Sequence, residues 1–112
     1  MPRKMSFLLT TEQIKNRTKT VTRRLGWWFL KSGDIVDACE KCQGLKKGEK
    51  IKMICPIRIL HTRAVLLCNV EPLDYIKEGF PELDNDQFIE MFMREMKCNR
   101  TETVNRIEFE YL

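Results

Sequence analysis

The stretch TKTVTRRLGWW, residues 18–28, combines β-branched residues with two adjacent arginines and two adjacent tryptophans. Its first half is typical of a β-strand, because Thr and Val pack well on a pleated surface. Successive strand side chains point to opposite faces, so Arg23 and Arg24 should diverge, one toward a cleft and the other over the outside. Guanidinium groups suit phosphates and indole rings stack on bases. From its residues alone, the stretch is either an ordinary basic edge strand or a strand that lines a cleft for an anionic, flat ligand. Trp27 or Trp28 should lie beside the cleft, and at least one of them should plug the core.

Upstream of this strand, the sequence predicts a short strand over residues 6–9, followed by a short helix. Thr10 and Gln13 have the spacing of a capping box, and Leu9 and Ile14 have the spacing of a hydrophobic staple. Both patterns mark a helix N-terminus, so the helix should begin directly after Thr10.

Downstream, one turn of helix is expected within residues 25–34, closed by a turn at Gly33, and a strand is expected over residues 34–41. The Ile- and Val-rich residues 51–68 should be extended. Pro56 lies within them and marks an edge, a bulge or a strand break, because proline cannot donate a ladder hydrogen bond.

The C-terminal third predicts two helices. Residues 71–79 are expected to form a short helix, with Pro72 near its first position and Gly79 as its stop. Asp84 and Gln87 then form a second capping box at the start of a longer amphipathic helix.

The longer helix carries an apolar stripe that is typical of a core rather than a binding groove, namely Phe88, Phe92 and Met96 with Ile89 and Met93 beside them. Residues 106–112 alternate apolar and acidic side chains and predict a half-buried closing strand. Several short strands with helices at two points favour an α+β fold, a small curled sheet or barrel with flanking short helices.

The composition fits one soluble globular domain over residues 1–112, with a core over about residues 6–112. The formal net charge is +4, but its distribution is uneven. Residues 1–63 carry fifteen Lys/Arg against five Asp/Glu, whereas the remainder carries five against eleven. We therefore expect the first half to build an anion-facing side, although the two halves could also neutralise each other across the fold.

Several functional classes are not expected. No run of apolar residues is long enough to span a membrane, and the segment after the basic start is too short for a signal peptide, so we expect a cytoplasmic protein. An odd number of cysteines, five, favours reduced thiols. Cys39 and Cys42 lack a second ligand pair, and the only histidine, His61, is not tied to them. We therefore expect no metal site and no cofactor.

The elements RTKTVTRR, PIRILHTR, KEGF and the terminal VNRIEFEYL together resemble an ASCH domain of the PUA-like superfamily. The resemblance extends from about residue 6 to residue 112 and is strongest to small phage and bacterial members. It implies a compact PUA-like β-barrel with flanking helices and a cleft suited to RNA or a nucleotide.

Some ASCH proteins are small amidohydrolases that deacylate acetylated cytidine without a metal. By resemblance, their catalytic lysine, threonine and glutamate correspond to Lys19, Thr22 and Glu78. A neutral lysine could activate the threonine hydroxyl, and a glutamate could relay the proton to the leaving amine. Burial and the nearby Arg17, Arg23 and Arg24 could lower the pKa of the lysine. On a regular strand Lys19 and Thr22 would face opposite sides, so they converge only if the strand begins after Lys19 or contains a bulge.

Glu78 is expected in the last turn of its helix, where the helix dipole disfavours a carboxylate. A cationic partner across a cleft would resolve this conflict, and so would a frayed, solvated helix end. The sequence leaves both open.

The second functional class is a binding module for RNA, a nucleotide or a nucleoside. Its expected contacts are Lys19, Thr20, Thr22, Arg23, Arg24, Trp27 and Trp28, with Lys46, Lys47 and Lys50 on the polar loop of residues 43–50. Whether Lys19 and Glu78 meet in one pocket decides between the catalytic class and the binding class. Lys19 and Glu78 within hydrogen-bonding range in one small pocket favour catalysis, and an open groove with these groups apart favours binding.

Overall fold

The computed structural model describes residues 3–42 and 45–112, so Gln43 and Gly44 of the expected polar loop lie outside the described residues. The described residues contain five strands, three α-helices and one short 3-10 helix. In chain order these are β1 (Arg3–Ser6), η1 (Leu8–Thr10), α1 (Thr11–Lys15), β2 (Val21–Arg24), β3 (Ile35–Cys39), β4 (Met53–Leu66), α2 (Asp74–Lys77), α3 (Asn85–Met96) and β5 (Thr103–Tyr111). No helix in this described part is long and apolar enough to cross a membrane.

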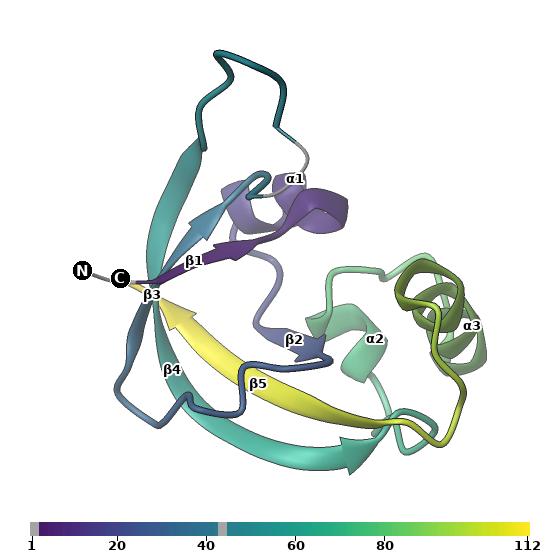
Figure 1. The fold of residues 1–112 in the computed structure, drawn as a ribbon. Coiled ribbons are helices and arrows are strands. Elements are labelled where there is room, and N and C mark those ends of the chain that lie inside the picture. The colour runs from purple at the N-terminus through teal and green to yellow at the C-terminus, as the bar shows by residue number, and fades with distance from the viewer. Residues whose placement is uncertain (1–2, 43–44) are drawn as a thin grey trace.

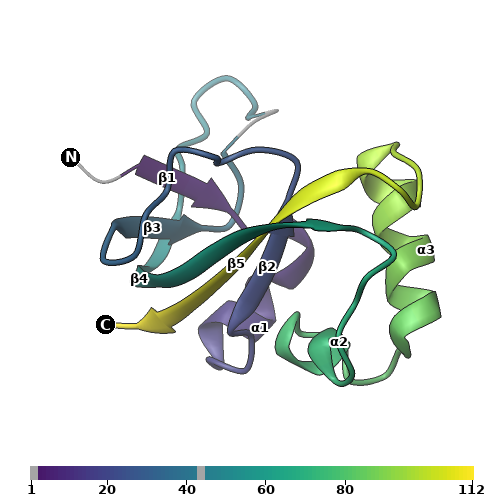
Figure 2. The same cartoon turned by 90° about the horizontal axis from the view of Figure 1, so that it is seen from below.

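The five strands form one mixed sheet in the order β1-β3-β4-β5-β2. β1 runs parallel to β3, and the other pairs are antiparallel. The sheet curls into a half-barrel, with α1 at one side of its opening and α2 and α3 at the other (Figures 1 and 2). The predicted α+β class is confirmed, and the barrel is a curled half-barrel whose edge strands β1 and β2 are not paired to each other.

The curl is concentrated in the long strands β4 and β5, which arc beneath the opening in Figure 1. A register shift between Ile59 and His61 interrupts their pairing, and such a bulge bends and twists the strand that carries it. Pro56 neither breaks β4 nor lies at this bulge. It pairs with Asp37 of β3, and the pairing of β4 with β5 starts only at Ile57, so Pro56 has a locally free side.

Two groups of buried apolar residues stabilise the fold. One lies inside the curl and includes Phe7, Ile14, Ile59 and Phe109. The other packs α3 against the end of the sheet through Phe88, Ile89, Phe92, Leu67 and Val104. The alternation predicted for residues 106–112 is confirmed, because Ile107 and Phe109 are buried and Glu108 and Glu110 are only partly covered.

The N-terminal expectations are partly wrong. β1 ends at Ser6, and Leu8 and Leu9 lie in η1 with at least half of their side chains exposed, so the Leu9–Ile14 staple does not form. Thr10 precedes α1 but makes no capping hydrogen bond. Gln13 Nε2 instead donates to the carbonyl oxygen of Gly79 at 2.9 Å. A tertiary contact has therefore replaced the local capping box.

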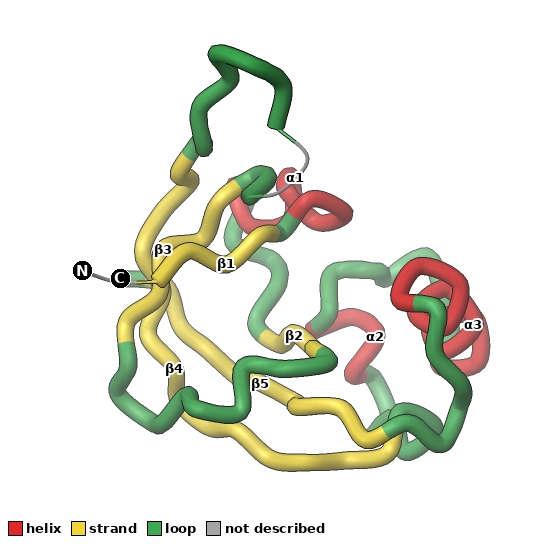
Figure 3. The backbone as a smooth tube through the Cα atoms, in the orientation of Figure 1, coloured by secondary structure: helices red, strands yellow, loops and turns green. Residues whose placement is uncertain are grey.

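The second capping box is confirmed, because Asp84 accepts from the Gln87 backbone and Gln87 accepts from the Asp84 backbone. The stop at Gly79 is also confirmed, with a φ of 100° that favours glycine. The helical turn expected within residues 25–34 is wrong, since this segment is a loop of turns (Figure 3). The turn at Gly33 is present, and the Lys31 backbone donates to the Asp34 carboxylate there.

Candidate functional site

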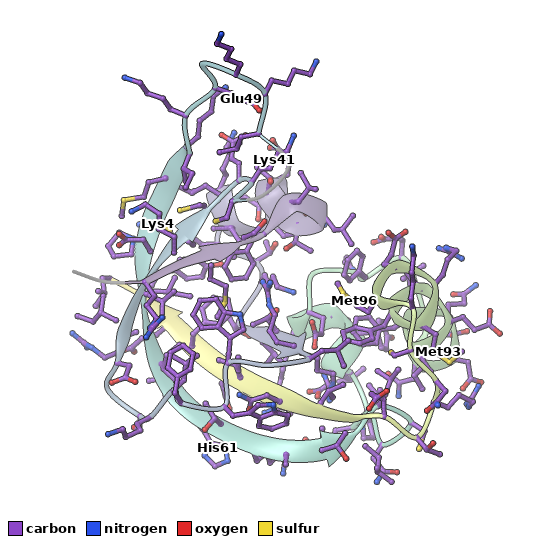
Figure 4. The ribbon with its side chains drawn as sticks, viewed as in Figure 1. Lys4, Lys41, Glu49, His61, Met93 and Met96 are labelled. Atoms are coloured by element: carbon purple, nitrogen blue, oxygen red, sulfur yellow. The ribbon has the colours of Figure 1, made fainter. Side chains whose placement is uncertain are left out.

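A cavity of about 460 Å³ lies between η1 and α3, above β2 and the end of α2. Its polar side chains come mainly from the segment that forms β2 and from the end of α2. Its apolar side chains come from η1, from Phe80 and from α3. The lining residues that matter here are Lys19, Thr22, Arg23, Arg24 and Glu78 on the polar side, and Leu8, Leu9, Phe80, Phe88, Met91, Phe92 and Met96 on the apolar side. In Figure 4, Met96 lies on the side of α3 that faces α1 across this opening.

Lys19 lies before β2, which begins at Val21. The backbone amides of Thr18 and Lys19 donate to the carbonyl oxygen of Gln13, and that of Thr20 donates to Lys77 at 2.8 Å. These contacts hold residues 18–20 against α1 and α2 ahead of β2, and the carbonyl oxygen of Thr20 makes the first contact with β5 by accepting from the Phe109 amide at 3.0 Å. The condition for convergence is therefore met, because the strand begins after Lys19.

Lys19 and Glu78 form a buried pair. Lys19 Nζ donates to the Glu78 backbone oxygen at 2.6 Å and to Glu78 Oε1 at 3.2 Å, and each side chain is only 4% exposed. Burial lowers the pKa of Lys19 to about 8. Glu78 opposes this shift, and the charges of Arg24 and Arg23 reinforce it. Lys19 therefore loses its proton closer to neutral pH than an ordinary lysine does.

Glu78 is held from a second side by Arg23. Arg23 donates to Glu78 Oε2 at 2.8 Å and to Asp74 Oδ2 at 2.6 Å. Arg106 of β5 adds two hydrogen bonds to Asp74, of 2.9 and 3.1 Å. Although burial favours a neutral carboxyl, the hydrogen bonds from Arg106 and Arg23 lower the pKa of Asp74. The unfavourable helix-end position of Glu78 is thus resolved by cationic partners, not by fraying.

Arg24 and Thr22 share one face of β2. Arg24 Nε lies 3.1 Å from Thr22 Oγ1, and the Arg24 guanidinium lies over the Phe7 ring at 4.7 Å. Arg24 forms no ion pair with any described residue, and burial lowers its pKa to about 10. The expectation that one arginine would cover the outside is wrong, because the Arg23 side chain is fully buried and Arg24 is partly buried.

Several other expected site residues lie elsewhere. Thr20 contacts its neighbours through its backbone, and neither tryptophan lines the cavity. Trp27 packs against the core cluster inside the curl, as expected of one tryptophan, whereas Trp28 is 54% exposed. Lys46, Lys47 and Lys50 belong to the loop that projects away from the opening, where Figure 4 labels Glu49. The same figure places His61 on the outer side of β4.

The sequence reasoning missed Asp74 and Arg106. An aspartate in the first turn of a helix is usually explained by the helix dipole, and an arginine on a closing strand by exposure. The sequence carries no signal for Arg106, because it alternates in phase with Glu108 and Glu110 on the polar side of the closing strand, although the structure leaves it only 4% exposed.

The curled mixed sheet, with the cavity between its short helices, defines a small α+β half-barrel. A solved structure with this arrangement is an ASCH domain from Lactobacillus crispatus, with a TM-score of 0.59 and 16% sequence identity over 92% of this chain and 70% of that one. No protein-family model and no curated protein matches the sequence. The protein therefore has the fold of an ASCH domain, as the sequence resemblance implied.

Proposed function

We propose that the cavity is the active site of an amidohydrolase that removes an acyl group from the exocyclic amine of a nucleobase. The observation that carries this proposal is the buried contact of 3.2 Å between Lys19 and Glu78, in the same cavity as the Thr22 hydroxyl. Amide hydrolysis requires a nucleophile, a group that carries its proton to the leaving amine and a charge next to the developing oxyanion. The polar side of the cavity supplies a candidate for each role.

In the proposed reaction, Thr22 Oγ attacks the acyl carbonyl carbon while neutral Lys19 accepts the hydroxyl proton. The carbonyl oxygen becomes an oxyanion beside Arg24, whose Nε lies 3.1 Å from Thr22 Oγ1. The C–N bond then breaks, and Lys19 returns its proton to the amine through Glu78. Water hydrolyses the resulting threonine ester, giving a carboxylic acid and restoring both side chains. Because Glu78 holds Lys19, it also fixes the direction of proton transfer.

The apolar side of the cavity supports a planar ligand. Phe80 is partly exposed and offers aromatic surface, with the buried ring of Phe88 6.0 Å from it, and Leu8 and Leu9 on the opposite wall are largely exposed although they are apolar. Exposed apolar side chains beside a cavity favour a ligand that covers them. A base with an apolar acyl group between these walls would place its amide at the polar side.

The experiment is incubation of the purified protein with a panel of N-acylated cytidines, followed by chromatography of the products. The variant is Lys19→Ala, and the matched control is Lys15→Ala, because Lys15 belongs to α1 and its side chain is 47% exposed. We expect turnover by the native protein and the control and none by Lys19→Ala, with circular dichroism showing that all three are folded. Equal turnover by Lys19→Ala would remove Lys19 from the mechanism.

One observation favours a second function, binding without catalysis. No hydrogen bond joins Lys19 to Thr22 among the described residues, since Lys19 Nζ donates to Glu78 and Thr22 accepts from Arg24. Proton transfer from Thr22 then needs a bridging water or a shift of Lys19 on substrate binding. If no acylated cytidine is hydrolysed, the cavity is better explained as a binding site for an unmodified base or nucleotide, and RNA affinity over a salt series tests this explanation.

A further inference from the structure

We propose that the ligand is a single-stranded polynucleotide, and that the nucleotide next to the one in the cavity lies in an adjoining hollow. This proposal rests on the proposed function and names its substrate class. The hollow is lined by Arg3, Arg24, Leu25, Gly26, Trp27 and Phe29, so it lies between the start of β1 and the loop that follows β2.

Arg24 connects the two places, because it lines both the cavity and the hollow. It is partly buried and has no carboxylate partner among the described residues, whereas Arg23 beside it binds two. Arg24 uses its Nε on Thr22, and its other four N–H donors make no hydrogen bond to a described residue; Glu78 is near enough to raise the pKa of Arg24 but forms no ion pair with it, so these donors suit a phosphate. A phosphate on Arg24 would lie between a base in the cavity and a base in the hollow, which is the order of a nucleic-acid backbone.

The hollow itself combines aromatic surface with a second cation. Phe29 is 50% exposed, and its ring lies 5.5 Å from that of Trp27, centroid to centroid. The Arg3 guanidinium lies over the Phe29 ring, 4.4 Å from its centroid. Like Arg24, Arg3 forms no ion pair within the described part of the chain. No carboxylate lines the hollow. Stacking rings flanked by unpaired cations are what single-stranded nucleic acids require.

The loop that presents these rings is held in place by a specific contact. Trp27 has a φ of 64°, in the left-handed region that bulky residues rarely occupy. The side chain of Asn105, 2% exposed on β5, donates to the carbonyl oxygens of Trp27 at 3.0 Å and Gly26 at 3.3 Å. A buried amide therefore holds a strained aromatic segment at the surface. Such strain persists where the surrounding structure enforces it, and it clusters at binding sites.

The test uses a fluorescein-labelled single-stranded RNA of eight cytidines, with fluorescence anisotropy read over a salt series. Phe29→Ala removes the stacking ring, and Arg3→Ala removes the second cation. Lys4→Ala is the matched control, because Lys4 is the next residue of β1, is also exposed and points to the opposite face. Binding and turnover of single nucleosides serve as the second readout.

We expect Phe29→Ala to weaken RNA binding about fivefold or more. Arg3→Ala should weaken it as well and reduce the slope of log affinity against log salt by about 0.7. Lys4→Ala should leave the slope unchanged, and neither hollow variant should change the handling of a single nucleoside. RNA binding by both variants at native strength would overturn the proposal, and so would equal affinity of the native protein for the RNA and for cytidine monophosphate.

A failure of the proposed hydrolase function can be distinguished from a failure of the polynucleotide proposal. If no acylated cytidine is hydrolysed, free or within an oligonucleotide, the hydrolase assignment is lost. Loss of RNA affinity in Phe29→Ala and Arg3→Ala would in that case still support the hollow as part of a binding site.

Discussion

The first prediction concerns the effect of removing the Lys19 amine on the pH dependence of stability. Lys19→Met keeps a side chain of similar length but cannot bind a proton. Glu78 keeps Arg23 as a buried partner in this variant, at 2.8 Å in the native protein. The variant therefore removes one titrating group from the folded protein and leaves the carboxylate that it contacts with a charge partner.

The size of the effect follows from the two pKa values of Lys19, 10.5 in the unfolded chain and about 8 in the folded protein. Between these values the unfolded chain binds the proton and the folded protein does not. The contribution of Lys19 to stability is therefore complete above pH 10.5 and is lost as the pH falls through 8. Its slope approaches about 1.4 kcal/mol per pH unit, which integrates to about 1 kcal/mol between pH 7 and pH 9.

Other groups titrate near this range, so the measurement must be a difference. Burial raises the pKa of Cys39 from 9.0 to about 11, and the loss of stability that this causes begins near pH 9. The same loss occurs in the native protein and in Lys19→Met, and it cancels when one curve is subtracted from the other.

The assay is urea unfolding followed by tryptophan fluorescence at pH 7, 8 and 9 under reducing conditions. We expect the native protein to gain about 1 kcal/mol relative to Lys19→Met over this range. Lys15→Met, at a half-exposed position of α1, should follow the native curve. Parallel curves for the native protein and Lys19→Met would mean that Lys19 has an ordinary pKa when folded, and the argument for a neutral lysine would fail.

Three further predictions follow from the same structure. If Lys19 acts as the base, kcat/KM for an acylated cytidine should rise about fivefold from pH 7 to pH 8, and a flat or falling profile would contradict this role. Gly79→Ala should lower the free energy of unfolding by more than about 1 kcal/mol, because its φ is 100° and a new Cβ would lie 2.9 Å from Gln13 Cγ. The control is Gly26→Ala, whose new Cβ would have no atom within 4 Å, and this variant should unfold nearly as the native protein does. Asp84→Ala should reduce stability by about 1 kcal/mol in urea unfolding, and an unchanged midpoint would mean that the capping box contributes little.

The two capping boxes explain how much of the fold could be predicted from the sequence. Asp84 and Gln87 follow the pattern because their partners are local and no other group competes for them. Thr10 and Gln13 have the same spacing, but the Gly79 carbonyl, 66 residues away, binds the Gln13 amide instead. Periodicity and caps therefore predict helices such as α3, whereas a competing tertiary partner is invisible to them.

The candidate site likewise depends on tertiary contacts that sequence patterns do not predict. The resemblance supplied Lys19, Thr22 and Glu78 as candidates, but β-branched residues favour a strand equally well from Thr18 or from Val21. What decides the start of β2 is the contact of residues 18–20 with the carbonyl ends of α1 and α2. Asp74 could not be predicted for a related reason, since its two arginine partners come from separate strands.

The buried charges around Glu78 are more than folding alone would favour. Arg23, Arg106 and Lys19 are buried against only two carboxylates, Asp74 and Glu78. Removing an ion from water carries a penalty of several kcal/mol, and a well-packed apolar replacement of such a group is often at least as stable. Glu78 could be satisfied by Arg23 alone, and Asp74 by Arg106 alone. The additional cation, Lys19, is the group whose pKa burial lowers to about 8, with the charges of Arg24 and Arg23 reinforcing the shift and Glu78 opposing it. A network that makes a lysine easier to deprotonate stabilises the fold less than a simple pair would, and the proposed role of Lys19 as a base provides the reason for keeping it.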